Sequence, residues 1–206
     1  MTEWDRFFRE NITKIFKEKN QVIDIGGGLR IDKNKNNRFN KHNLFIKDLI
    51  KDKDHYIILD KVADYKPDIV GDIHDLPFDD NSIESIVCIA ILEHVERPWQ
   101  AIDEMYRVLK PGGYLYIYVP FLYYYHPMKG YYKDYYRFTK DGLKYLLKDF
   151  SHLELQNVRG AIETVFNLLP SPLLKKRGSK IFYILDRLFK KDNSNQTSGY
   201  SIFCIK

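Results

Sequence analysis

The sequence predicts a single α/β domain in which helices cover a doubly wound, mostly parallel sheet. Short apolar runs typical of buried strands alternate with longer segments of helical periodicity through the first five units of the chain. The first of these runs enters three successive glycines, as a strand does where it turns tightly into the next unit. A length of 206 residues suits one hydrophobic core.

The expected elements follow from these patterns in order. The helix at 2–19 has its apolar residues on one stripe, the helix near 99 has Pro98 in its first turn, and the one after it has Thr139 as its N-cap. Lys110-Pro111-Gly112-Gly113 is read as a helix stop followed by a turn. Strands are expected at 21–25, 55–59, 68–72, 82–90, 114–119, 153–158 and 200–205, and helices at 2–19, 44–50, 99–109, 139–150 and within 161–191.

Composition argues against several classes of protein. The net charge of +5 is mild and the lysines are spread along the chain, so nucleic-acid binding is not indicated. No apolar run reaches the roughly 18 residues that a membrane span requires, and the charged start has no signal-peptide hydrophobic region. Cys88 and Cys204 lie in apolar runs, which predicts reduced core cysteines and a cytoplasmic protein.

The stretch 21–28 is the one around which the chain is organised. Apolar residues broken only by Asp24 lead into Gly26, Gly27 and Gly28, which have no Cβ to keep a ligand away from the backbone. The spacing does not fit the dinucleotide fingerprint, because no third glycine follows at the required position. The alternative is a plain glycine turn between a strand and a helix.

Four segments, in this order, resemble motifs of class I S-adenosylmethionine (SAM) dependent methyltransferases of the type-11, small-molecule group. They are Val22 to Gly28, Gly71-Asp72 with Leu76-Pro77-Phe78, Leu92-Glu93-His94-Val95, and Arg107-Val108-Leu109-Lys110-Pro111-Gly112-Gly113. The resemblance covers roughly residues 22–150. It implies a Rossmann-like, seven-stranded sheet with an antiparallel last strand at or near the edge. It also implies methyl transfer from SAM, with S-adenosylhomocysteine as the product.

The resemblance implies a cofactor site made by strand ends. Asp60, at the end of the second strand, would accept hydrogen bonds from the ribose hydroxyls, and Asp72 from the adenine amine, while the Ile73 N–H donates to a ring nitrogen. Without the resemblance, Asp72 is a plain turn residue. The residues assigned to the cofactor are Asp24, Gly26, Gly27, Gly28, Asp60, Lys61, Asp72, Ile73, Ala90 and Ile91.

Residues 121–138 form a tyrosine-rich loop that we expect to act as a lid or substrate wall. His126, within it, is the candidate base for an oxygen nucleophile, because a pKa near 6.5 suits proton removal at neutral pH. The alternative is a loop histidine satisfied by a backbone carbonyl. His94 is a second catalytic candidate, weighed against a structural role beside the cofactor. The residues expected to position the acceptor are Tyr125, Asp134, Tyr135 and Arg137.

The expected acceptor is a small molecule. The segment 134–139 is similar to methyltransferases of sugar and surface-polysaccharide biosynthesis, which favours an oxygen of a sugar or lipid-linked intermediate. Nucleic-acid or protein methylation and a non-catalytic SAM-binding role are the alternatives, although the motifs for base methylation are absent from the sequence. A dehydrogenase reading of Tyr125 and Lys129 fails because Pro127 interrupts the helix that this pair needs.

The segment 161–191 is basic, amphipathic and interrupted by Pro170 and Pro172. It is compatible with peripheral contact to an anionic membrane or a partner, and also with two helices that cover the final strands. No metal site is indicated, since the six histidines are scattered and neither cysteine has a ligand partner at metal-binding spacing. The identity of the acceptor and the oligomeric state are left open.

Overall fold

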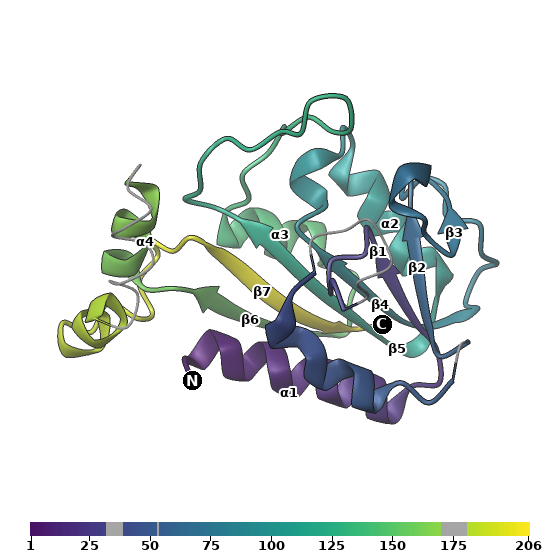
Figure 1. The fold of residues 1–206 in the computed structure, drawn as a ribbon, viewed down its shortest axis with the longest axis horizontal. Helices are drawn as coiled ribbons and strands as arrows, with labels where there is room; N and C mark the ends of the chain where they lie inside the picture. The colour runs from purple at the N-terminus through teal and green to yellow at the C-terminus, as the bar shows by residue number, and fades with distance from the viewer. Residues whose placement is uncertain (32–38, 53, 170–180) are drawn as a thin grey trace.

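The computed structural model describes residues 1–31, 39–52, 54–169 and 181–206. A seven-stranded sheet in the order β3-β2-β1-β4-β5-β7-β6 runs through these residues (Figure 1). Strands β1 to β5 pair in parallel, whereas β7 is antiparallel to both of its neighbours, β5 and β6. The predicted class I methyltransferase fold is therefore confirmed, with the antiparallel last strand lying one position inside the edge.

The helices and strands have the following bounds. The strands are β1 (Val22–Ile25), β2 (Tyr56–Asp60), β3 (Ile69–Val70), β4 (Ile83–Ile89), β5 (Leu109–Pro120), β6 (His152–Val158) and β7 (Gly199–Ile205). The α-helices are α1 (Glu3–Glu18), α2 (Pro98–Val108), α3 (Lys140–Leu146) and α4 (Ala161–Leu168), and the 3-10 helices are η1 (Lys41–Leu49), η2 (Ala63–Tyr65) and η3 (Leu92–His94).

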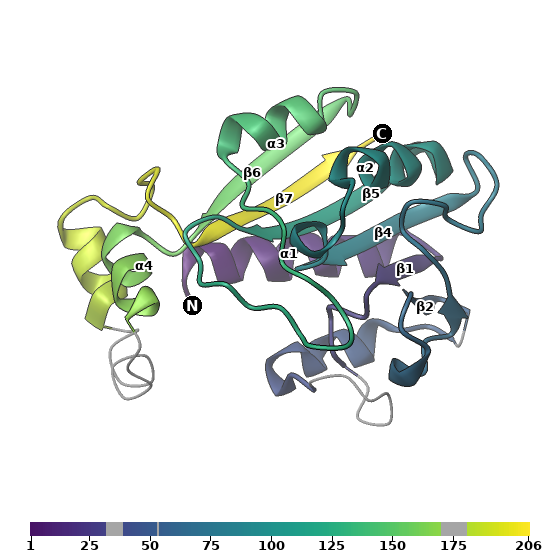
Figure 2. The same cartoon turned by 90° about the horizontal axis from the view of Figure 1, so that it is seen from above.

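Helices cover both faces of the sheet, as a doubly wound fold requires (Figure 2). Helix α1 and η1 lie on one face, where Ile12, Ile15 and Phe16 pack with Tyr116 and Phe203 of the strands. Helices α2 and α3 lie on the other face and bury a second apolar cluster against the same strands. That cluster includes Ile102, Met105, Leu143, Leu147, Ile86 and Leu115. The sheet is thereby packed on both faces, and this packing positions its strand ends.

Three expected elements differ from the structure. The segment 44–50, expected as the first crossover helix, is the 3-10 helix η1, tied down by a hydrogen bond from the Asn43 side-chain amide to the Leu29 carbonyl at 2.8 Å. Helix α3 ends at Leu146, short of the expected residue 150. The expected turn before the fifth strand belongs to β5, because Gly112 and Gly113 exchange backbone hydrogen bonds with Lys206 at 2.8 and 3.0 Å.

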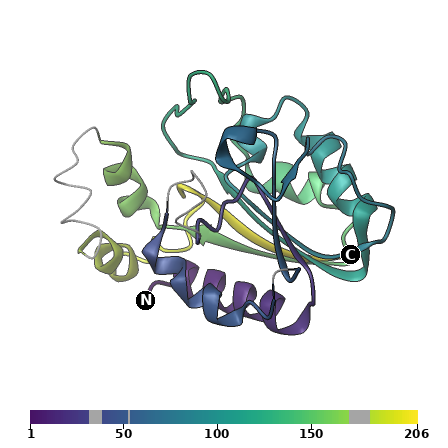
Figure 3. The ribbon, with the colours of Figure 1, turned by 45° about the vertical axis from the view of Figure 1, so that its right-hand side comes forward.

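Helix α4 and a second helical segment at 181–188 lie beyond the ends of β6 and β7 (Figure 1 and Figure 3). They pack on each other through the stacked rings of Phe166 and Phe182, whose centroids are 3.7 Å apart. The expectation that they cover the final strands is therefore wrong. The two prolines and the basic run Lys175-Lys176-Arg177 fall outside the described residues. Among the helices that are described, none has the length and apolarity needed to cross a membrane.

Candidate functional site

The predicted cofactor residues lie at the carboxyl ends of β1, β2, β3 and β4. These four strands are parallel neighbours, so their carboxyl ends meet at one edge of the sheet, where α/β folds bind ligands. The strand register places Ile25 beside Leu59 on one side and beside Cys88 on the other. The glycine turn after β1 is therefore flanked by the residues that follow β2 and β4.

Asp24 lies beneath the glycine turn, and its side chain is fully buried. Its carboxylate accepts hydrogen bonds from the N–H groups of Gly28 and Leu29, both at 3.0 Å, and from the Tyr56 hydroxyl at 2.6 Å. The Gly26 N–H donates to the Leu59 carbonyl at 2.7 Å. The Asp24 carboxylate therefore fixes the glycine turn, and the three N–H groups named here are hydrogen-bonded within the protein.

Two of the glycines are required by close contact with β4 and the residues after it. A Cβ on Gly28 would lie 2.6 Å from Ile89 Cβ and 2.9 Å from the Ile89 carbonyl oxygen. A Cβ on Gly26 would overlap the Ile91 side chain, and the positive φ of +75° at Gly26 also disfavours any other residue. The glycines therefore bring the turn and the end of β4 together at this edge.

The bond between Tyr56 and Asp24 predicts a pH-dependent contribution to stability. Burial raises the pKa of Asp24 to about 7, against the opposing effect of its hydrogen bonds. Because the unfolded carboxyl titrates near 4, the native state binds the extra proton between about pH 4 and 7, so this group makes stability fall as pH rises through that window. A hydroxyl supports the ionised carboxylate more strongly than the neutral acid. Tyr56→Phe should therefore cost about 1 kcal/mol near pH 5.5 and about 2 to 3 kcal/mol near pH 8.

Urea unfolding of wild type and Tyr56→Phe at the two pH values measures this difference. Tyr114→Phe is the control, because the Tyr114 hydroxyl donates to Glu18 at 2.6 Å at an exposed position. The control should lose less than about 1 kcal/mol at both pH values. An equal loss for Tyr56→Phe at the two pH values would show that Asp24 does not titrate in this range.

Asp60 and Asp72 present carboxylates at the ends of β2 and β3. Asp60 accepts a hydrogen bond from the Val62 N–H at 2.8 Å, and burial raises its pKa. Asp72 accepts from the Lys61 ammonium and from the His74 ring, both at 2.7 Å. Burial acts to raise the pKa of Asp72, but these donors outweigh it and lower the pKa to about 2. Both groups lie at the one edge, and a carboxylate keeps further lone pairs for a ligand.

Ala90 turns the chain sharply at the carboxyl end of β4. Its φ of +55° lies in the left-handed region, which is uncommon for a residue with a side chain and is often found at functional sites. The Ala90 N–H donates to the Tyr118 carbonyl at 2.9 Å, which holds this conformation against β5. The turn sends Ile91 over the glycines and places η3 above the same edge.

The tyrosine-rich loop at 121–138 leaves β5 and crosses this edge until it contacts η2. The N–H groups of Tyr135 and Tyr136 donate to the Glu93 carbonyl at 2.7 and 3.2 Å, which ties the loop to η3. At the far side Tyr131 stacks on Tyr65, with ring centroids 5.4 Å apart. The loop therefore lies across the ends of several strands, as the predicted lid would.

Within the loop, Arg137 and Asp134 bind each other. Two guanidinium nitrogens of Arg137 lie 2.6 and 2.7 Å from the two oxygens of the Asp134 carboxylate, which is buried. Arg137 also donates to the carbonyl oxygens of Tyr124 and Tyr136 at 2.8 and 2.7 Å. These two predicted acceptor-binding residues thus fold the loop back on itself.

The other two predicted acceptor residues lie at the surface. Tyr125 is 73% exposed, and the Tyr135 hydroxyl donates to Glu96 at 2.8 Å.

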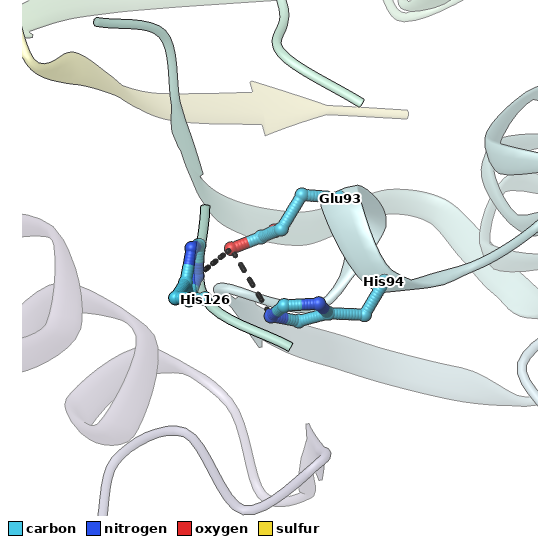
Figure 4. A group of neighbouring side chains, drawn as sticks. All are labelled: Glu93, His94 and His126. Atoms are coloured by element: carbon cyan, nitrogen blue, oxygen red, sulfur yellow. Dashed lines mark ion pairs between the residues drawn. The ribbon is translucent and has the colours of Figure 1, made fainter. Parts of the chain in front are cut away.

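The two candidate catalytic histidines meet at Glu93, a residue that sequence reasoning did not single out (Figure 4). Glu93 Oε1 lies 3.8 Å from His94 Nε2 and 3.7 Å from His126 Nε2. The pKa of His126 is raised, chiefly because the Glu93 carboxylate faces it. In the sequence, Glu93 is the acidic residue that directly follows an apolar strand segment and precedes a candidate histidine.

Part of this chain is similar in sequence to known methyltransferases. A family model described as a methyltransferase domain matches residues 52–117, which include β2 to β4 and η3. An uncharacterized methyltransferase of Mycobacterium tuberculosis (strain ATCC 25177 / H37Ra) is 53% identical over 38 residues, 18% of this chain and 15% of the relative. A ubiquinone/menaquinone biosynthesis C-methyltransferase of Ruegeria sp. (strain TM1040) is 43% identical over 49 residues, 24% of this chain and 20% of the relative. The chain thus spans a fifth or less of the length of these curated relatives.

A solved structure extends the likeness to the whole fold. The structure of a SAM dependent methyltransferase from Archaeoglobus fulgidus aligns with a TM-score of 0.60 at 17% sequence identity, covering 98% of this chain and 92% of that one. At this identity the likeness concerns the fold. The chain therefore has the fold of class I methyltransferases, and its residues 52–117 match the model of a methyltransferase domain family.

Proposed function

We propose that this protein is a SAM-dependent methyltransferase acting on a small-molecule acceptor. The observation that carries the proposal is the grouping of the glycine turn, Asp60 and Asp72 at one edge of the sheet, beneath the tyrosine-rich loop. The family match over residues 52–117 supports the same activity.

The side chains at this edge fit the chemistry of an adenosine moiety. A ribose diol and an adenine amine are hydrogen-bond donors, and Asp60 and Asp72 are carboxylate acceptors on adjacent strand ends. The low pKa of Asp72 keeps it an acceptor at neutral pH. The Lys61 ammonium, bonded to Asp72 at 2.7 Å, holds that carboxylate in place. When bound, SAM would supply an electrophilic methyl group, and the protein's task is to hold the acceptor in line with it.

We place the acceptor side of the proposed site at the junction of η3 and the tyrosine-rich loop. Glu93, His94 and His126 converge there from two chain segments, which supports their place beside the acceptor's nucleophilic atom. The loop would exclude water from the reacting groups. We assign the acceptor-binding role to the exposed aromatic rings of the loop, such as Tyr125 and Tyr131, ahead of the internally paired Arg137 and Asp134.

For the acceptor itself we propose an oxygen of a sugar or a lipid-linked intermediate. Exposed tyrosine rings offer flat apolar faces beside a hydroxyl group, which suits the apolar faces and hydroxyls of a sugar ring. The quinone C-methyltransferase relative favours a carbon acceptor instead, but it matches over only 49 residues. A panel of sugar nucleotides and quinone precursors, assayed for methyl transfer from labelled SAM, distinguishes the two.

Calorimetric titration with SAM and S-adenosylhomocysteine tests the cofactor site. We expect micromolar binding of both compounds by wild type, weakened about tenfold or more by Asp72→Ala, because a hydrogen bond to a charged acceptor contributes about 1.5 to 3 kcal/mol. The matched control is Asp75→Ala, since Asp75 lies in the same turn and is exposed. Asp75→Ala should bind SAM as wild type does.

Two outcomes would count against the proposal. If folded wild type binds neither compound, the protein does not use this cofactor. If Asp75→Ala and Asp72→Ala lose the same affinity, the effect comes from the turn and not from the Asp72 carboxylate.

A further inference from the structure

Glu93 ends in a carboxylate that is buried and has no hydrogen-bond donor. The residue is fully buried in η3, and neither of its carboxylate oxygens has a hydrogen-bond partner within the described part of the chain. Buried carboxylates ordinarily have donors or a cation beside them, because burial of an unpaired charge is costly. The groups that face this carboxylate are the Nε2 atoms of His94 and His126 (Figure 4).

Both histidine rings are oriented by hydrogen bonds on their other nitrogen. His94 Nδ1 lies 2.7 Å from the Lys133 carbonyl oxygen, and His126 Nδ1 lies 3.0 Å from the Tyr124 carbonyl oxygen. His126 Nδ1 also lies 3.2 Å from Asp134 Oδ2 and 3.4 Å from Arg137 Nη2. A carbonyl or carboxylate oxygen can only accept, and these acceptors are nearer than the Arg137 donor, so we assign the ring proton to Nδ1 in each case. In the neutral rings, the Nε2 lone pairs then point toward the Glu93 carboxylate. Metal-binding histidines are oriented in this way by a carbonyl on the opposite nitrogen.

We propose that Glu93, His94 and His126 bind a divalent first-row transition-metal ion, such as Zn²⁺. Three hydrogen-bond acceptor groups converge, and a bound cation would give each of them a partner. One ligand atom from each residue lies within 4.8 Å of the other two. Two imidazoles and one carboxylate form a ligand set used by zinc and non-haem iron, whereas Mg²⁺ and Ca²⁺ prefer all-oxygen sites.

The spacing fits an ion once the two imidazole rings move closer together, since the three ligand atoms lie within 4.8 Å of one another. Bonds of about 2.0 to 2.2 Å in tetrahedral geometry set neighbouring ligand atoms about 3.4 Å apart. The two distances from Glu93 Oε1 are 3.8 and 3.7 Å, so each must shorten by a few tenths of an ångström. Side-chain rotation supplies such a shift, and His126 is on a loop. Three protein ligands also leave a coordination position for water or an acceptor oxygen, as in catalytic zinc sites.

The site would join two separate segments of the chain. Glu93 and His94 belong to η3, whereas His126 belongs to the tyrosine-rich loop. A bound ion would therefore tie the loop to the edge of the sheet. Metal binding should lower hydrogen exchange in residues 121–138, a readout that does not depend on activity or on SAM.

Calorimetric titration of the full chain, stripped with chelator, tests the proposal with Zn²⁺, Co²⁺ and Mg²⁺. We expect one Zn²⁺ per chain with a Kd of about 1 µM or tighter, and no comparable binding of Mg²⁺. Co²⁺ should give the visible absorption of a four- or five-coordinate ion. Glu93→Gln and His94→Ala should each weaken Zn²⁺ binding about 100-fold or more. Glu93→Gln keeps the side-chain shape, and a second variant, His94→Ala, keeps the test decisive if the first does not fold.

His152→Ala is the matched control, because His152 Nε2 lies 2.8 Å from Glu154 in a surface pair of the same two residue types. It should bind Zn²⁺ as wild type does. The proposal is overturned if wild type binds neither Zn²⁺ nor Co²⁺ tighter than about 100 µM. It is also overturned if His152→Ala removes binding while His94→Ala does not. No cofactor is present in this titration, so its result is independent of SAM binding.

Discussion

Gly28→Ala is expected to destabilise the protein by about 3 kcal/mol and to remove detectable SAM binding. The added methyl group would lie 2.6 Å from Ile89 Cβ, 2.9 Å from the Ile89 carbonyl oxygen and 3.3 Å from Ile89 Cα. Backbone atoms of a central strand cannot move away cheaply, so β1 and β4 must separate at the edge where the cofactor residues meet. Chemical denaturation measures the stability, and calorimetry with SAM measures the binding.

A second substitution separates this backbone clash from a side-chain clash. Ile89→Ala retains Cβ, Cα and the carbonyl, so it should not rescue Gly28→Ala. A methyl group on Gly26 meets only the outer atoms of Ile91. Gly26→Ala should therefore recover stability when combined with Ile91→Ala, leaving about 1 to 2 kcal/mol for the positive φ. Rescue of Gly28→Ala by Ile89→Ala would show that the turn is not held where the structure places it.

Arg137→Ala is expected to release the tyrosine-rich loop from the sheet edge. The substitution leaves the buried Asp134 carboxylate without its bidentate partner and frees the carbonyls of Tyr124 and Tyr136. Removing one member of a buried ion pair costs about 3 to 5 kcal/mol, and the partial exposure of Arg137 lowers this to about 2 to 3 kcal/mol. Because the loop can detach while the rest of the protein stays folded, the loss of global stability should not exceed the free energy of that local opening.

Hydrogen exchange followed by mass spectrometry measures the opening. Protection should fall at least tenfold in residues 121–138 and stay unchanged in β4 and β5. Arg137→Lys should recover little of it, because an ammonium cannot make the paired contacts of a guanidinium. Lys129→Ala, which removes a positive charge in the same loop, is the control and should leave protection as in wild type. Unchanged exchange in Arg137→Ala would mean that other contacts hold the loop.

The fold could be predicted because it depends on patterns that are local in sequence. Alternating strands and helices, the glycine turn and Thr139 as a helix cap each reflect neighbouring residues. The shortened helix α3 and the extended β5 could not be predicted, because they depend on contacts with distant residues. Gly112, for example, pairs with Lys206 at the other end of the chain.

The candidate site, too, could be predicted only in part from the sequence. Asp24 and the glycines could be recognised from their spacing, but the identity of their hydrogen-bond partners depends on the register that places Val22 beside Tyr56. The meeting of Glu93 with His126 could not be read from spacing, because the path of the loop between them is set by Arg137 and Asp134. Ion pairs within a loop produce no periodic pattern in the sequence, so they could not be predicted from it.

The position of β7 between β5 and β6 has a consequence for the order of folding. Strand β6 has β7 as its sheet neighbour, and the residues from 159 to 198 separate the two in sequence. Until β7 inserts, β5 and β6 each expose an unpaired strand edge, the feature that favours association between chains. Closing such a long-range pairing is slow compared with local helix formation. We therefore expect an early intermediate that contains β1 to β5, and we expect aggregation to compete with the insertion of β7 during refolding at high protein concentration.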